Sequence, residues 1–194
     1  MNAVQPIKDP AVVDAIRNYL KNTSERNYIF FSLGVYSGLR VSDLLSLKVS
    51  AVRDQIYIEL LEQKTANTRK RKKKKKFIIH PSLLPDLSRY IEGMEDDEYL
   101  FPSRQRKRTG KGGEPFDRST AYKMLKDVAK RFGLKDIGTH TMRKTWGYRL
   151  YKDDPENLAL LMDMFGHSET SITLRYLGLT QEAMDDAIKR LSYT

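Results

Sequence analysis

The chain has 194 residues, 40% of them hydrophobic, which is enough to bury a core in one domain. It contains no cysteine, so disulfides and cysteine-ligated zinc sites are excluded and an intracellular location is favoured. The first ten residues lack the pattern of a signal peptide, and the longest apolar stretch, residues 28–36, is too short to span a membrane. We therefore expect a cytoplasmic protein without a membrane segment, whose formal net charge of +10 suits an anionic partner.

The first quarter of the chain predicts three helices. Asp9 followed by Pro10 is a typical helix start, because the carboxylate can cap the first turn and proline fits the first helical position. Residues 24–36 predict a second helix that is apolar on nearly all sides and therefore buried. Gly38 is suited to end it in the left-handed conformation, and residues 42–47 predict a short third helix.

A β-hairpin is predicted next. Residues 56–62 are rich in β-branched and aromatic side chains, and residues 77–80 read as the antiparallel partner strand. Segment 64–76, which we place in the connecting loop, carries nine basic residues and no acidic one. Like charges repel, so we expect this loop to be mobile without its anionic partner. One such run by itself fits a solvated loop or a localisation signal equally well.

The positive charge is confined to two segments. Residues 81–94 predict a helix and residues 98–102 a short extended stretch. The glycine-containing loop 104–115 follows, and its segment 104–111 carries five more basic residues and no acidic one. This loop lacks the ending of a phosphate-binding Walker loop. Outside the two basic segments the chain has 21 basic and 25 acidic residues. Two short basic segments on a slightly acidic body indicate a nucleic-acid partner.

From residue 117 onward the pattern is helical. Asp117 can cap a helix that ends before Gly133, with an expected inner face of Tyr122, Leu125, Val128 and Ala129. Further helices are predicted at residues 140–152, 155–165 and 168–175, followed by an amphipathic tail at residues 180–192. We therefore expect a single, mainly α-helical domain with one small antiparallel β-hairpin.

Five residues with chemically versatile side chains stand out: Arg40, His140, Arg143, His167 and Tyr176. Each alone has an ordinary structural explanation, such as a surface ion pair, a polar residue after a helix cap, or core packing. His140 and Arg143, however, lie three residues apart on one face of a helix start, where free N–H groups also suit a phosphate. The combination is therefore more informative than any single residue.

In order and spacing, these residues resemble the catalytic domain of the tyrosine recombinase (phage integrase) family. The motifs are Ser37-Gly-Leu-Arg40, a lysine in the hairpin, His140-Thr-Met-Arg143, Gly166-His167-Ser168 and Tyr176, which lies nine residues after His167. The stretch Tyr99-Leu-Phe-Pro102 is also similar to the family's. The resemblance extends from about residue 9 to the tail and implies the fold of the DNA breaking-rejoining enzymes.

The resemblance implies a site-specific recombinase that cleaves and rejoins DNA to integrate, excise or invert a mobile element, without metal, ATP or other cofactor. Tyr176 would attack a phosphodiester and form a 3′-phosphotyrosyl bond. Arg40 and Arg143 would hold the non-bridging oxygens, since planar guanidinium groups suit phosphate. His140 would assist proton movement at the tyrosine, and His167 would hydrogen-bond the phosphate. Replacing either arginine with alanine should then abolish cleavage with little loss of stability.

Other assignments depend on the same resemblance. Lys64 would protonate the departing 5′-oxygen, with Lys70 as the alternative. Asp43 would orient Arg40, although an ordinary acidic residue at a helix N-terminus fits the position nearly as well. His80 is interpreted as structural, and three histidines without cysteine predict no metal cluster. The remaining predicted DNA-binding residues are Arg69, Lys70, Arg71, Lys72, Lys73, Lys74, Arg104, Arg106, Lys107, Arg108 and Lys111.

Family members place a core-binding domain ahead of the catalytic one and act as tetramers on two synapsed sites. Only eight residues precede Asp9, so we expect no such domain in this chain, which resembles either an excised catalytic domain or a natural single-domain invertase. We expect a monomer when free and a homotetramer on synapsed double-stranded DNA. The tail either docks onto a neighbouring protomer or packs on its own domain. The alternative functions are a non-catalytic DNA-binding regulator and a type IB topoisomerase.

Overall fold

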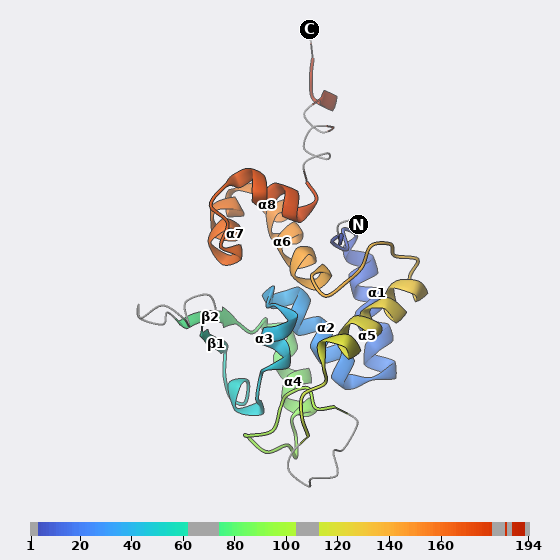
Figure 1. Ribbon diagram of the computed structural model, residues 1–194, viewed down its shortest axis with the longest axis vertical. Coiled ribbons are helices and arrows are strands. Elements are labelled where there is room, and N and C mark those ends of the chain that lie inside the picture. The colour runs from blue at the N-terminus through green and yellow to red at the C-terminus, as the bar shows by residue number, and fades with distance from the viewer. Residues whose placement is uncertain (1–3, 62–73, 104–112, 180–184, 186–187, 193–194) are drawn as a thin grey trace.

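The computed structural model describes residues 4–61, 74–103, 113–179, 185 and 188–192. Helices dominate these residues, and a two-stranded antiparallel sheet is added to them (Figure 1). In the described part of the chain, no helix is long and apolar enough to cross a membrane. The expected fold class, mainly α-helical with one small hairpin, is confirmed.

The N-terminal helices form as their local signals predict. Helix α1 (Pro10–Thr23) begins where the Asp9 carboxylate accepts a hydrogen bond from the Ala11 amide at 2.8 Å. Helix α2 (Glu25–Ser37) is buried along most of its length and ends at Gly38, whose φ is 65°. Helix α3 (Val41–Leu45) and the 3-10 turn η1 (Val49–Ala51) follow. Arg40 therefore stands between the end of a buried helix and the start of α3.

The second strand of the hairpin begins at Lys74, three residues earlier than the sequence predicted. Strand β1 (Tyr57–Leu61) pairs with β2 (Lys74–Ile78), so Lys74, Lys75 and Lys76 lie in a strand and their placement in the loop was wrong. Lys74 and Lys76 both pair with Glu59 of β1, at 3.1 and 2.9 Å. The Glu59 carboxylate offsets the repulsion between the two lysines, so the basic residues 74–76 can form part of strand β2.

The middle of the chain forms η3 (Pro81–Leu83), α4 (Leu84–Tyr90) and α5 (Arg118–Arg131). Asp117 caps α5 as expected, accepting from the Thr120 amide at 2.6 Å. The buried face of α5 differs from the predicted one at one position. Tyr122 is 44% exposed and Ala121 is buried instead. Both positions lie at helical spacing from Leu125, so the periodicity could not choose between them, and the close packing of α5 admits the smaller side chain.

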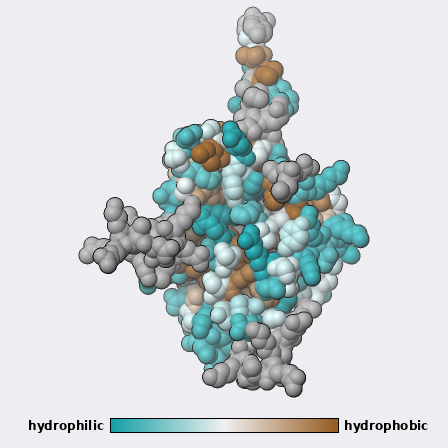
Figure 2. Space-filling model, viewed as in Figure 1, coloured by the Kyte–Doolittle hydropathy of each residue, from teal (hydrophilic) through white to brown (hydrophobic). Residues whose placement is uncertain are grey.

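The C-terminal part consists of α6 (Thr141–Asp153), η4 (Pro155–Asn157), α7 (Leu158–Phe165) and α8 (Thr170–Leu177). Helix α8 runs two residues further than predicted, so Tyr176 lies in its last turn. In Figure 1 these helices form the upper end of the body, above α1 to α5. In the described part of the tail, Ile188 and Leu191 are 65% and 62% exposed, and Figure 2 shows apolar surface on the segment that projects at that end.

In the described part of the chain, two hydrophobic clusters make up the core, and α6 connects them. The first contains residues from Ile7 to Met142, and the second contains Tyr148, Leu161, Phe165, Leu177 and Leu179. Gly147 allows α6 to approach the second cluster, because a β-carbon there would lie 2.7 Å from Phe165 and 2.8 Å from Leu177. The N-terminus of α6, which carries His140 and Arg143, therefore lies between the two clusters.

Candidate active site

Arg143 is the buried centre of the site. It projects from the first turn of α6, is 4% exposed, and donates from Nη1 to the Gly38 carbonyl and from Nη2 to the Met164 carbonyl at 2.6 Å. Its guanidinium carbon lies 4.8 Å from the centre of the Phe165 ring. Burial, helped by the charge of Arg40, lowers the pKa of Arg143 to about 10, so the side chain stays positively charged at neutral pH. Arg143 thus joins the ends of α2 and α7.

Tyr176 points its hydroxyl at the same place. The phenolic oxygen lies 3.4 Å from Nδ1 of His140, and the positive charge of Arg143 acts to lower its pKa. The Tyr176 ring packs against Phe165, with ring centres 4.9 Å apart, and against His167, at 5.5 Å. Helix α8 therefore delivers a phenol to a position next to an imidazole and a guanidinium.

The electrostatics of this pair set its resting protonation state. Burial raises the pKa of Tyr176, against the opposing effect of Arg143 and Arg40. Burial lowers the pKa of His140, and the charges of Arg118, Lys144, Arg143 and Arg40 lower it further. A neutral histidine therefore faces a protonated tyrosine at neutral pH. In the tautomer that carries its hydrogen on Nε2, the His140 Nδ1 atom can accept the phenol proton.

His167 follows the left-handed Gly166 that ends α7. Its Nδ1 atom lies 3.0 Å from Oγ1 of the fully buried Thr173, a residue of α8 that fixes the orientation of the ring. The centre of the His167 ring is 5.4 Å from that of Phe165. The imidazole is therefore held beside Tyr176 by contacts to both α7 and α8.

Arg40 and Asp43 contribute through their charges. Arg40 is exposed at the start of α3, and its charge lowers the pKa values of Arg143, His140 and Tyr176. Asp43 lies in the first turn of α3, and its charge favours the protonated form of Arg143. Among the described contacts, no hydrogen bond or ion pair joins the Asp43 carboxylate to the Arg40 guanidinium.

The hairpin is attached to this site by Lys75. Its ammonium group donates to the Asp163 carbonyl at 3.1 Å and lies 3.6 Å from the Asp163 carboxylate. Asp163 precedes Met164, whose carbonyl holds Arg143. Lys74 lies in β2 and forms an ion pair with Glu59. The other predicted basic residues lie outside the described part of the chain: Lys64, Arg69, Lys70, Arg71, Lys72, Lys73, Arg104, Arg106, Lys107, Arg108 and Lys111.

Sequence reasoning missed Lys144. It directly follows Arg143 but is only 7% exposed, and its Nζ atom lies 4.8 Å from the centre of the Tyr176 ring. A lysine in a helix is normally a surface residue, so no local pattern indicated its burial. In the described residues, no group of three or more histidine, cysteine, aspartate or glutamate side chains could hold a metal ion.

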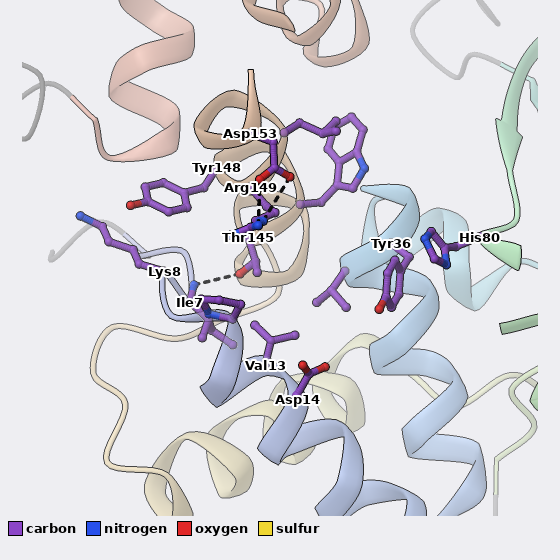
Figure 3. Close-up of a pocket in the computed structure, with 14 residues that line it drawn as sticks. Ile7, Lys8, Val13, Asp14, Tyr36, His80, Thr145, Tyr148, Arg149 and Asp153 are labelled. Carbon is purple, nitrogen blue, oxygen red and sulfur yellow. Dashed lines mark hydrogen bonds and ion pairs between the residues drawn. The ribbon is translucent and has the colours of Figure 1, made fainter. Parts of the chain in front are cut away.

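A cavity of about 360 Å³ lies apart from these residues, between the N-terminal segment, α2 and α6 (Figure 3). At its edge, the Ile7 amide donates to Thr145 Oγ1 at 2.9 Å, which ties the N-terminal segment to α6. The ring of His80 packs on Tyr36 with centres 4.3 Å apart, in keeping with a structural role. None of the described residues predicted to be catalytic lines this cavity.

Comparison with known proteins identifies the family. The chain is 38% identical to a probable integrase/recombinase, YoeC, of Bacillus subtilis, over 97% of each chain. Its fold is similar to that of the XerA recombinase, with a TM-score of 0.72 and 22% identity. It is also similar to the Tn1549 transposon integrase in complex with circular intermediate DNA, with a TM-score of 0.68 and 19% identity. The match to XerA covers 100% of this chain and 66% of the solved chain, and the match to the Tn1549 integrase covers 99% and 68%. Residues 9–183 match the model of the phage integrase family, and the chain therefore belongs to that family.

Proposed function

We propose that this chain is a site-specific DNA recombinase that cuts and rejoins DNA through a 3′-phosphotyrosyl intermediate. The observation that carries the proposal is the position of the Tyr176 hydroxyl, 3.4 Å from His140 Nδ1 and under the influence of the positive charge of the buried Arg143. A nucleophile, a base and a charged phosphate ligand thus meet at one point, on a chain of the phage integrase family.

In the cleavage step, the Tyr176 oxygen attacks the phosphorus of a DNA phosphodiester. A bond forms between phosphorus and the phenolic oxygen, the bond to the 5′-oxygen breaks, and the phenol proton passes to His140. Arg143 and Arg40 stabilise the charge that grows on the non-bridging oxygens. Lys64 gives a proton to the departing 5′-oxygen, with Lys70 as the alternative donor. The reverse step, with a 5′-hydroxyl as the attacking group, rejoins the strand.

His167 and Asp43 have supporting roles in this proposal. His167, oriented by Thr173, donates a hydrogen bond to the scissile phosphate. Asp43 orients Arg40 in this proposal, and its negative charge favours the charged form of Arg143. Because the phosphotyrosyl bond conserves the energy of the broken bond, rejoining needs no ATP, and in this proposal side chains take the place of a metal ion as phosphate ligands. We propose integration, excision or inversion of a mobile element as the role.

Double-stranded DNA is the proposed partner, bound through the two basic segments, residues 64–76 and 104–111. We take residues 9–178 as one catalytic domain that works in the cytoplasm, where it meets DNA. The protein is proposed to be a monomer when free and a homotetramer on two synapsed sites. The exposure of Ile188 and Leu191 supports a tail that docks onto a neighbouring protomer.

Trapping of the covalent intermediate tests this function. Nicked DNA substrates, drawn from sequences flanking the gene and from random pools, should yield a covalent protein–DNA band on a denaturing gel. Tyr176→Phe should abolish the band while Tyr122→Phe, a change at an exposed tyrosine, should retain it. An adduct that survives in Tyr176→Phe would show that another residue is the nucleophile. A wild-type protein that binds DNA without any adduct would instead be a non-catalytic regulator, and relaxation of supercoils without recombination would indicate a topoisomerase.

A further inference from the structure

Lys144 is a buried charge without a polar partner in the described part of the chain. It is 7% exposed, and among the described residues no carboxylate, carbonyl or hydroxyl forms a hydrogen bond or ion pair with its ammonium group. Burying a lone ammonium is costly, so lysines that are buried are normally paired. Such a residue in the middle of a candidate active site calls for a functional explanation.

Within the described residues, this ammonium group lies over the face of the Tyr176 ring. Its Nζ atom lies 4.8 Å from the ring centre, within the range of a cation–π interaction. Lys144 is also one helical turn after His140, and its amide donates to the His140 carbonyl at 2.9 Å. The same turn of α6 therefore places an imidazole at the Tyr176 hydroxyl and an ammonium group on the Tyr176 ring.

We propose that Lys144 is a positioning residue for the nucleophile, which holds the Tyr176 ring beside His140 and supplies a positive charge that favours the phenolate. This inference rests on the proposed function of Tyr176. A phenolate ring is richer in π-electrons than a phenol ring, so the attraction of the cation grows as the proton leaves. An interaction that strengthens toward the transition state accelerates the reaction rather than merely binding the ground state.

The same charge acts on His140. The groups that face His140 are Arg118 of α5, Arg143 and Lys144 of α6, Arg40 at the start of α3, and the Tyr176 hydroxyl of α8. All four cations, Lys144 among them, lower the pKa of His140 and so keep its imidazole unprotonated at neutral pH. Burial lowers the pKa of Lys144 itself, and the contact with the tyrosine ring favours its charged form.

Histidine titration by NMR tests the charge in the DNA-free protein. The chain has three histidines, and His140→Gln identifies the signal of His140. Lys144→Met keeps the side-chain length without the charge, so the pKa of His140 should rise. Lys144→Arg keeps the charge and should restore the wild-type value, while His80 serves as an internal control. An unchanged His140 pKa in Lys144→Met would contradict the proposal without involving DNA cleavage.

Cleavage of nicked substrates tests the effect on the nucleophile. Lys144→Met should slow adduct formation roughly tenfold, the size of a cation–π contact in a desolvated site. The acidic limb of its pH–rate profile should move to higher pH, because the pKa of His140 rises. Lys144→Arg should recover most of the rate. Lys144→Met should melt no lower than the wild type, because it removes a buried unpaired charge.

A substrate with sulfur in place of the bridging 5′-oxygen separates the roles further, since a thiolate leaves without protonation. The defect of Lys144→Met should persist on this substrate, because it concerns the attacking group. Recovery on the sulfur substrate would make Lys144 the donor to the leaving group and would overturn the proposal. A wild-type adduct with an unchanged rate in Lys144→Met would overturn this inference alone, whereas absence of a wild-type adduct would overturn the proposed function as well.

Discussion

The Tyr176 hydroxyl lies 3.4 Å from Nδ1 of His140, although 36 residues separate the two along the chain. Helices α6 and α8 pack against each other through the second hydrophobic cluster, which brings the phenol to the imidazole. Because burial and neighbouring cations lower the pKa of His140, the pair contains a neutral base in its resting state.

The first prediction concerns pH. A base with a lowered pKa stays unprotonated to lower pH, so the cleavage rate should hold through neutral pH. It should fall only as the pH drops below the ordinary histidine value of about 6.5. His140→Gln should reduce the rate by on the order of 10²–10⁴ and remove this acidic limb. Single-turnover cleavage between pH 5 and 9 measures both. If the His140→Gln variant still loses activity at low pH, the group that titrates there is not His140.

The second prediction concerns the two arginines. The sequence alone suggested that Arg143→Ala would leave stability intact, but the structure shows Arg143 buried between the Gly38 and Met164 carbonyls. Its loss should cost about 1–3 kcal/mol, because the unpaired carbonyls outweigh relief from burying the charge. Arg40→Ala, at an exposed position, should leave the melting temperature unchanged. Both variants should lose cleavage by on the order of 10²–10³. Equal melting temperatures for the two variants would contradict the bridging role of Arg143.

The third prediction tests the turn that supports Arg143. Gly38 has φ of 65°, and a β-carbon there would lie 2.3 Å from the Trp146 ring. Gly38→Ala should therefore destabilise the fold by roughly 3 kcal/mol or more, from backbone strain and from steric overlap. Gly93 has φ of 75° and open space around it, so Gly93→Ala should cost only about 1 kcal/mol. Chemical denaturation of both variants measures the difference, which isolates the contact with Trp146.

The fourth prediction concerns the hairpin. Glu59 forms ion pairs with both Lys74 and Lys76, and these lysines lower its pKa. Glu59→Gln should release both ammonium groups for DNA phosphates, giving tighter binding at low salt and a steeper salt dependence. Glu25→Gln, which removes a partner of Arg89 instead, is the matched control and should bind DNA like the wild type. Salt titrations of DNA affinity distinguish the two, and unchanged binding in Glu59→Gln would argue against phosphate contacts from these lysines.

The fifth prediction concerns the tail. Ile188 and Leu191 are mostly exposed, so replacing both with serine should leave the melting temperature unchanged. If the tail docks onto a neighbouring protomer, the double variant should still form the covalent adduct but assemble poorly on two-site DNA. Analytical ultracentrifugation with and without DNA checks this. A lowered melting temperature would show that the tail packs on its own domain.

Local chemistry made much of this protein predictable from its sequence. Asp9 and Asp117 start helices because their carboxylates satisfy free amides of the first turn, and Gly38 and Gly166 end helices because they adopt positive φ. These effects act over a few residues and are therefore visible in the sequence. The motifs around Arg40, His140, Arg143, His167 and Tyr176 likewise indicated the family, which the match of residues 9–183 to the family model confirms.

The tertiary structure alone decided which side chains are buried and which distant groups they meet. Lys144 and Tyr122 are both polar-tipped residues of helices, yet Lys144 is enclosed by the packing of α8 and Tyr122 is exposed beside the buried Ala121. Lys75 reaches α7 while Lys74 and Lys76 turn to Glu59, because successive side chains of a strand point to opposite faces. Periodicity marks the faces of an element, but only the packing of distant elements determines which face is covered and what covers it.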